Sequence, residues 1–188
     1  MPALQACIEA LLVGSVATGV IVAADRRQFE VMFGDQRVES ATADRVKEAL
    51  KGQGHVVVTS FNYTVLLTGE VPSTQAKAQA EKAAAEVPQV KTVVNELQIA
   101  GTSSATSRSN DAYITSKVKS SFLGNGKFRP TDVKVVTEAG VVYLLGLVTR
   151  EEADMATNIT RGTGGVQKVV RVFEYVSPPR KAPEPVNE

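Results

Sequence analysis

The feature that most constrains this chain is an internal repeat, because a pattern that occurs twice predicts two copies of one folding unit. A line of the form Val-x-Leu-x-Gly-x-Val occurs at residues 65–71 and again at residues 142–148. The similarity continues on both sides of this line, where the corresponding stretches are 45–50 with 117–122 and 90–94 with 166–170. Two copies of one small module therefore account for most of the 188 residues.

Within each copy, the spacing of apolar residues predicts the same order of helices and strands. A helix comes first, two β-rich runs joined by a short turn follow, and a second helix leads to a closing strand. The last of these helices begins with Thr149 and Glu152 at capping-box spacing. The predicted elements are a helix around 46–50, strands 56–60 and 64–68, a helix at 73–86 and a strand at 90–99, then a helix around 114–122, strands 133–137 and 141–145, a helix at 150–160 and a strand at 166–176.

This order predicts an α+β fold of two αββαβ modules, each a three-stranded mixed sheet packed on one face by two helices. We expect the copies to fold as separate domains that dock, because about 65 residues is small for an independent core. Gly69 and Gly146 are predicted to have a structural role, where the lack of a Cβ permits a sharp path or close approach. The predicted ranges are an N-terminal anchor and apolar tether at 1–34, the first module at 35–100, a linker at 101–108, the second module at 109–177 and a disordered Pro-rich tail at 178–188.

Composition narrows the functions that are open to this chain. A net charge of +1 argues against nucleic acid as a partner. The single histidine, His55, and the single cysteine are too few for most triads or for a four-ligand Cys/His metal site. His55 is interpreted as a turn residue, and Asp111, Asp132 and Glu138 as caps and turn residues. We therefore predict no enzyme activity, no catalytic residue, no cofactor and no metal.

The N-terminal stretch MPALQACIEALLVGSVATGVIVAADRR raises the question of an anchor. Leu4-Gln5-Ala6-Cys7 fits the lipobox pattern, in which the cysteine is lipidated. Residues 10–24 carry no charge but fall short of the roughly 20 apolar residues that a membrane span needs. A tether after a lipid anchor is therefore favoured over a transmembrane helix or ordinary core. Only residues 1–6 precede Cys7, so either the true start lies upstream, with the signal peptide of an exported precursor, or the match to the lipobox is accidental.

The repeated line and the αββαβ order resemble the tandem BON-domain outer-membrane lipoproteins. Asp25-Arg26-Arg27 before the first copy and Ser109-Asn110-Asp111 at the start of the second add to the resemblance, which covers residues 4 to about 176. It implies a lipid-bearing Cys7, a location on the periplasmic face of the outer membrane and non-enzymatic binding of phospholipid. The chain departs from this family at RQFEVMFG, residues 27–34, where an apolar run replaces a small-polar one.

The resemblance also implies lipid contact by the first helix of the second copy, and a helical wheel of residues 110–123 gives that helix a suitable face. Ile114, Val118, Ser121 and Phe122 gather on the side expected to meet the core. Tyrosine suits the headgroup level of a bilayer, and lysine attracts anionic lipid. The predicted lipid-binding residues are Tyr113, Ser116, Lys117, Ser120 and Leu123, with Lys119 at the flank.

Two interpretations of this face remain open. In the first, it binds an anionic phospholipid membrane, and the lipid-anchored protein supports outer-membrane integrity. In the second, Tyr113 and Leu123 pack against the other copy and Lys117 is only solvated. The alternative function is that of an envelope protein-interaction module without direct lipid binding. A hydrolase is least favoured because no nucleophile–base pair is visible. The sequence leaves the oligomeric state open.

Overall fold

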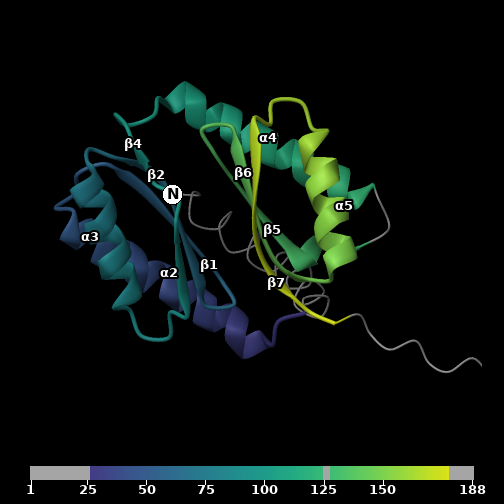
Figure 1. Ribbon diagram of the computed structural model, residues 1–188, viewed down its shortest axis with the longest axis horizontal. Coiled ribbons are helices and arrows are strands. Elements are labelled where there is room, and N and C mark those ends of the chain that lie inside the picture. The colour runs from purple at the N-terminus through teal and green to yellow at the C-terminus, as the bar shows by residue number, and fades with distance from the viewer. Residues whose placement is uncertain (1–25, 125–127, 178–188) are drawn as a thin grey trace, which may run out of the picture.

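Two tight hairpins organise this chain, one in each copy. The computed structural model describes residues 26–124 and 128–177. The first copy consists of α2 (Phe29–Ala49), β1 (His55–Phe61), β2 (Thr64–Val71), α3 (Thr74–Ala85), β3 (Thr92–Asn95) and β4 (Gln98–Ile99). The second consists of α4 (Ala105–Leu123), the short 3-10 helix η1 (Pro130–Asp132), β5 (Val133–Glu138), β6 (Val141–Val148), α5 (Arg150–Arg161) and β7 (Lys168–Tyr175) (Figure 1). The predicted α+β fold of two similar modules is confirmed.

The hairpin turns explain why the strands pair where the sequence predicts. Asn62 and Tyr63 join β1 to β2 with φ angles of 52° and 65°, and Ala139 and Gly140 join β5 to β6 with φ angles of 49° and 75°. Positive φ at both central residues is typical of a type I′ turn, whose twist matches that of antiparallel strands. β3 then pairs with β2, and β7 with β6, in parallel, so each sheet is mixed.

The closing strands of the two copies differ. β7 is continuous over eight residues, whereas the expected strand at 90–99 is divided into β3 and β4. At the break, the side chain of Asn95 accepts a hydrogen bond from the backbone N–H of Leu97 at 3.3 Å and donates one to the carbonyl of Lys77 at 3.0 Å. The break lets Leu97 enter the core, and it gives the first sheet a fourth short strand instead of the predicted three.

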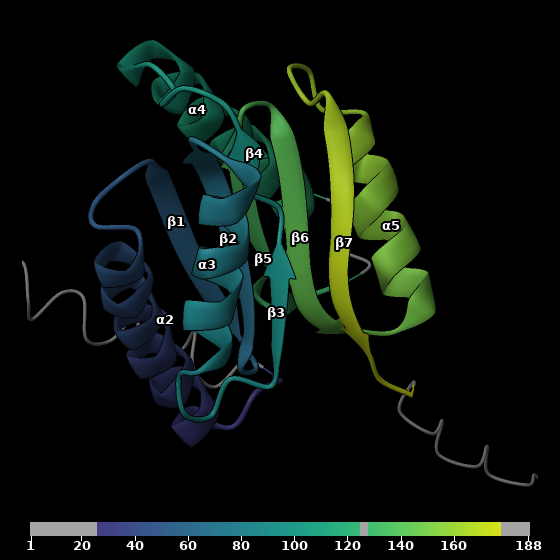
Figure 2. The ribbon, with the colours of Figure 1, turned by 60° about the vertical axis from the view of Figure 1, so that its left-hand side comes forward.

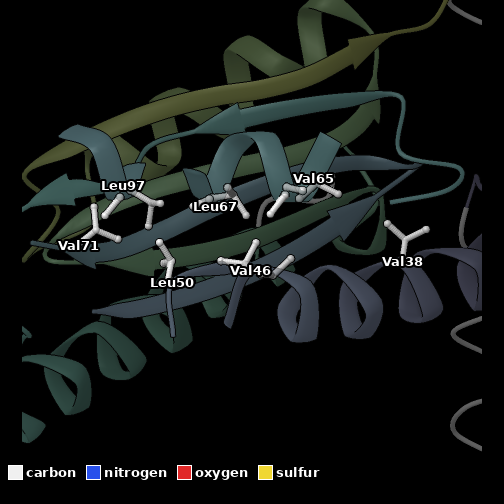
Figure 3. Packing of buried hydrophobic residues seen from close by; sticks show 12 residues of the cluster. Val38, Val46, Leu50, Val65, Leu67, Val71 and Leu97 are labelled. Atoms are coloured by element: carbon white, nitrogen blue, oxygen red, sulfur yellow. The ribbon is translucent and has the colours of Figure 1, made fainter. Parts of the chain in front are cut away.

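Each sheet carries its two helices on one face. Alternation along β2 directs Val65, Leu67 and Val71 toward the helices. Val46 of α2 and Leu50, the residue after this helix, complete the packing (Figure 3). The equivalent cluster of the second copy includes Ile114, Val118, Phe122, Val142, Leu144 and Val148. Each copy therefore has a core of its own between its helices and its sheet.

The opposite faces of the two sheets pack against each other. Phe61 of β1 and Leu66 of β2 form one buried cluster with Tyr143 and Leu145 of β6. Alternate residues of the same strands serve both cores, because successive side chains of a strand point to opposite faces. The layers therefore run helices, sheet, sheet, helices (Figure 2), and the predicted docking of the two copies is confirmed.

A buried aspartate on the first helix of each copy fixes the hairpin turn. Asp35 accepts hydrogen bonds from the backbone N–H groups of the first turn, both at 2.7 Å. Asp111 accepts the corresponding bonds of the second turn at 2.9 and 2.8 Å. Its interpretation as a cap or turn residue is wrong, because Asp111 lies inside α4 and only its side chain reaches the turn. The match of Asp35 with Asp111 places Val46 at the level of Phe122. The alignment of 45–50 with 117–122 is therefore wrong by about one helical turn, because an apolar pattern resembles itself after each turn.

Two helices begin earlier than the sequence indicated. α2 starts at Phe29, within the range expected for the tether, and α4 starts at Ala105, within the range expected for the linker. Ser104 caps α4 by accepting a hydrogen bond from the backbone N–H of Ser107 at 3.2 Å. Serine is common both in helix caps and in linkers, so the serine-rich composition did not reveal that the first turn of α4 begins here. Cys7, the rest of the tether and the tail at 178–188 lie outside the described residues.

Two neighbouring arginines tie the start of α2 to both copies. Arg26 binds Glu152 of the second copy through hydrogen bonds of 2.6 and 2.7 Å and pairs with the buried Asp132 at 3.2 Å. Arg27 pairs with Asp35 of the first copy at 2.7 Å. The hydrogen bond from Arg26 is the main reason that the pKa of Glu152 is lowered to about 2. Asp132, interpreted from the sequence as a turn residue, is also an ion-pair partner across the copies.

Candidate functional site

The inner side of α4 fixes the helix against the second sheet. Ile114, Val118 and Phe122 are at most 1% exposed. Phe122 also meets Phe128 edge-on, with ring centres 5.1 Å apart. Three buried anchors spaced by one helical turn leave the helix little freedom to rotate, so the residues on its outer side have a defined orientation.

The outer side of α4 presents the predicted stripe to solvent. Tyr113 is 63% exposed and Leu123 is 74% exposed. Ser116, Lys119 and Ser120 are exposed as well. The interpretation in which Tyr113 and Leu123 pack against the first copy is therefore wrong. Large exposed apolar side chains among polar ones are typical of a binding surface.

Lys117 is half-buried, whereas the helical wheel predicts that it faces outward. Its ammonium donates a hydrogen bond to the carbonyl of Gly164, in the loop between α5 and β7, at 2.7 Å. The same ammonium lies 5.4 Å from the centre of the Tyr113 ring. An ammonium has three donors, so two remain for another acceptor after the bond to Gly164. The structure thus holds Lys117 beside Tyr113 as an aromatic–cation pair.

Two serines of α4 use their hydroxyl hydrogens within the helix, so they offer a ligand acceptor oxygens and not hydrogen-bond donors. Ser116 donates its hydroxyl hydrogen to the carbonyl of Ala112, and Ser121 donates to the carbonyl of Lys117, both at 3.0 Å. Their lone pairs remain available to accept hydrogen bonds. Ser121 is exposed, which corrects the helical-wheel prediction that it meets the core. Its position lies at the edge of the buried stripe, where a small residue reaches solvent.

The charges of α4 favour an anionic ligand. The acidic residue of this helix, Asp111, is buried and occupied by the hairpin turn. Its basic residues are Arg108, Lys117 and Lys119. The charged groups on the outer side of α4 are therefore all basic, although the net charge of the whole chain is only +1.

Two buried carboxyl groups, one from each copy, are near enough for their charges to interact. Glu138 at the end of β5 is 9% exposed, and Glu70 of β2 is 6% exposed. Burial is the largest cause that raises the pKa of Glu138 to about 7, followed by the charges of Glu70 and Asp111, with Arg108 acting in the opposite direction. Sequence reasoning interpreted Glu138 as a turn residue and missed this pair. The two glutamates come from different copies, so no local signal could indicate that they meet.

The structure also locates the features to which no chemistry was assigned. His55 is the first residue of β1, as its interpretation as a residue leading into a strand requires. Across residues 26–124 and 128–177, no group of three or more His, Cys, Asp or Glu side chains is placed to hold a metal ion. In the same residues, no helix has the length and apolar character to cross a membrane.

Comparison with known proteins identifies the class to which these two modules belong. The BON domain model matches residues 35–101 and 110–177. The chain is 37% identical over 175 residues to the outer membrane lipoprotein DolP of Haemophilus influenzae, covering 92% of this chain and 90% of that protein. It is 34% identical over 154 residues to the 21 kDa hemolysin of Actinobacillus pleuropneumoniae, covering 81% and 79%. It is 28% identical over 182 residues to the osmotically-inducible protein Y of Escherichia coli, covering 86% and 90%.

The chain therefore belongs to the BON domain family and carries two BON domains. Its similarity to an outer membrane lipoprotein extends over nearly the full length of both proteins. This similarity supports an outer-membrane, lipid-anchored location for the chain, as the sequence resemblance implied.

Proposed function

We propose that this protein is anchored by a lipid on Cys7, binds anionic phospholipid through the outer side of α4 and supports outer-membrane integrity from the periplasmic face. The pairing of Tyr113 with Lys117 is the observation that carries the proposal. An exposed ring and a cation held beside it can meet the interfacial region and a phosphate at the same time. The burial of Asp111 leaves no acidic group on this helix to repel the lipid.

The strength of this contact follows from its parts. A lysine near an anionic membrane contributes on the order of 1 kcal/mol, so Lys117 and Lys119 alone support only weak binding. Tyr113 and Leu123 add apolar surface that the membrane can cover. An anchor at Cys7 raises the local concentration of lipid around the domains, so weak contacts suffice.

Sedimentation with vesicles tests the proposal. We expect Lys117→Glu to weaken binding of the full chain to anionic vesicles roughly thirtyfold, since it replaces an attraction by a repulsion, each on the order of 1 kcal/mol. The loss should be largest at low salt, where the charges are least screened. Tyr113→Ala should weaken binding at all salt concentrations, because it removes apolar surface. Zwitterionic vesicles should show little effect of Lys117→Glu.

The first copy offers a matched control. Lys91 lies 5.1 Å from the centre of the Tyr63 ring, so Lys91→Glu makes the same charge change beside another aromatic ring. We expect this variant to bind anionic vesicles like the parent. If the Lys117 and Tyr113 variants also bind like the parent while their circular dichroism shows a folded protein, α4 is not the lipid face. The chain would then be better described as an envelope protein-interaction module.

A further inference from the structure

Two phenylalanines at the start of α2 form an apolar surface that the outer side of α4 does not include. Phe29 and Phe33 are 56% and 51% exposed, and their rings meet edge-on with centres 4.5 Å apart. They are one helical turn apart, so they lie on the same side of α2. Gln36, Arg37 and Ser40 continue this side and, with Glu30 and the two rings, line a shallow depression. We call these six residues the α2 tip.

The α2 tip has no part in holding the fold together. The buried side of α2 is made of other residues, namely Gly34, Asp35, Val38, Thr42 and Val46. A phenylalanine side chain gains about 1.5–3 kcal/mol when it is fully buried, and these two rings gain little of that in the isolated protein.

The position of the α2 tip in the chain identifies what covers it. Residues 1–25 lead directly into Arg26 and Arg27, which are fixed to the two copies by ion pairs. Phe29 follows at once as the first residue of α2. If Cys7 carries the lipid, the chain enters the membrane from this point of the molecule. The bilayer is therefore an apolar phase that an anchor at Cys7 would bring to the end of the molecule where α2 begins.

The charges of the α2 tip define the kind of lipid surface that fits. Glu30 and Arg37 are its ionisable groups, and their formal charges cancel. The tip therefore gains nothing from an anionic headgroup over a zwitterionic one. Its contribution comes from the two rings and should be independent of salt. In this respect it is the opposite of the basic outer side of α4.

We propose that the α2 tip is a second membrane contact, in which Phe29 and Phe33 enter the interfacial region of the bilayer that holds the anchor. This contact rests on the lipid anchoring proposed above and adds a neutral, apolar attachment to it. Arg37, one turn beyond Phe33, is placed to reach a phosphate from the same side of the helix. Two attachments at the start of α2 would restrict how the BON domains rotate over the membrane surface.

Tryptophan fluorescence tests this contact directly, because the chain contains no tryptophan. In the full lipidated chain on vesicles, we expect Phe33→Trp to give blue-shifted emission that brominated phospholipids quench. The quenching should be the same in zwitterionic and anionic vesicles and at low and high salt. Tyr175→Trp is the matched control, since Tyr175 is 48% exposed at the end of β7, and its emission should stay unquenched.

A separate chain with Tyr113→Trp distinguishes this proposal from that for α4. Quenching at position 33 without quenching at position 113 supports the α2 tip and refutes the α4 face. Quenching at 113 alone supports the α4 face and overturns the α2 tip. Mass spectrometry that finds no acyl group on Cys7 of the exported protein would overturn both the anchor and the argument for the tip. Emission at 33 that shifts with protein concentration in the absence of lipid would indicate a second copy as the occupant and would also overturn it.

A loss-of-contact variant gives an independent measurement. We expect the double change of Phe29→Ser and Phe33→Ser to speed transfer of the lipidated chain between vesicles roughly tenfold, as expected for the loss of about 1.4 kcal/mol of membrane contact. Ile99→Ser removes an equally exposed apolar side chain from β4 and should leave the transfer rate unchanged. Equal transfer rates for the double variant and the parent would contradict the proposal.

Discussion

The first helices of the two copies hold equivalent places in the fold but carry opposite charge. α2 has five acidic and three basic residues, whereas α4 has one acidic and three basic residues. In both helices a buried aspartate accepts hydrogen bonds from the backbone of the hairpin turn, Asp35 in one copy and Asp111 in the other. The fold therefore requires only the inner side of each helix. The outer side has been free to diverge, which is where a difference in function can arise between two copies of one module.

The ends of the first hairpin strands show a second difference of this kind. Phe61 closes β1 and Glu138 closes β5, and both lie at the contact between the sheets. The guanidinium of Arg27 lies over Phe61, 4.0 Å from its ring centre, whereas the charge of Glu70 acts on Glu138 and raises its pKa. One end of the contact is thus neutral or favourable, and the other stores unfavourable charge.

The largest expected effect comes from the two equivalent glycines. A Cβ at Gly69 would collide with the backbone carbonyl of His55, the first residue of β1, and a Cβ at Gly146 would collide with that of Asp132, the last residue of η1 just before β5. Gly69 also has a φ of +109°, which other residues rarely adopt. We expect Gly69→Ala to lower the free energy of unfolding by about 4 kcal/mol and Gly146→Ala by about 2 kcal/mol. Urea denaturation of both variants measures this, and equal losses would show that the backbone angle is unimportant.

The second effect concerns the tie between the copies. Removal of the Arg26 side chain leaves the buried Asp132 with the more exposed Arg129 as its ion-pair partner, at 3.2 Å, and one oxygen of the carboxylate already has no hydrogen-bond partner in the described structure. We expect Arg26→Ala to lower the free energy of unfolding by roughly 3 kcal/mol, as is typical when one partner of a buried ion pair is lost. The lowered pKa of Glu152 also predicts a pH dependence. The stability that its ion pair with Arg26 contributes is complete above pH 4.5 and is lost as the pH falls toward 2. The Arg26→Ala variant should therefore lose less stability over that range than the parent.

A double-mutant cycle with Asp132→Asn checks the cause of this loss. One cause to test is the Asp132 carboxylate, which has less compensating charge once Arg26 is removed. If this carboxylate is responsible, Asp132→Asn should lower the free energy of unfolding less in the Arg26→Ala background than in the parent. Additive losses would mean that Arg26 acts through Glu152 alone. Chemical denaturation followed by circular dichroism is sufficient for all four proteins.

The smallest effect is a pH dependence that belongs to the second copy alone. The folded-state pKa of Glu138, about 7, lies above its ordinary value of 4.5, so the folded protein keeps a proton that the unfolded chain releases. The stability linked to Glu138 is therefore complete below pH 4.5, falls as the pH rises and is lost above about 7. We expect Glu138→Gln to raise the free energy of unfolding by about 2 kcal/mol at pH 8 and to have little effect at pH 4.

The matched change tests whether the carboxylate across the contact matters. Glu70→Gln should lower the pKa of Glu138, since the charge of Glu70 helps to raise it. The pH at which stability declines should then move downward. A pH profile that is the same in both variants and the parent would mean that the pKa of Glu138 does not differ between the folded and the unfolded protein.

Much of the fold could be predicted from the sequence because it depends on local patterns. The hairpins, the second helices and the capping box of Thr149 with Glu152 are short-range features, and each formed within a few residues of its expected position. The break at Leu97 and the early starts of α2 and α4 were missed. These depend on a core position to fill or on a cap that composition cannot distinguish from a linker.

The candidate site was predictable to the same extent. The exposure of Tyr113, Lys119 and Leu123 follows from helical periodicity once the buried stripe is known. The bond from Lys117 to Gly164 could not be foreseen, because it joins residues far apart in the chain through the packing of α4 beside α5. The assignment of lipid binding to this face came from the family resemblance and stays a prediction until the vesicle experiments are done.

The sequence by itself determined that this chain has two αββαβ modules, since a repeated pattern of apolar residues, turns and caps specifies each module locally. Only the tertiary structure decided how the modules face each other. The meeting of Leu66 with Tyr143, of Arg26 with Asp132 and of Glu70 with Glu138 requires both sheets to be in place. Contacts between copies depend on which sheet face is left uncovered and on its detailed shape. No periodicity within one copy carries that information.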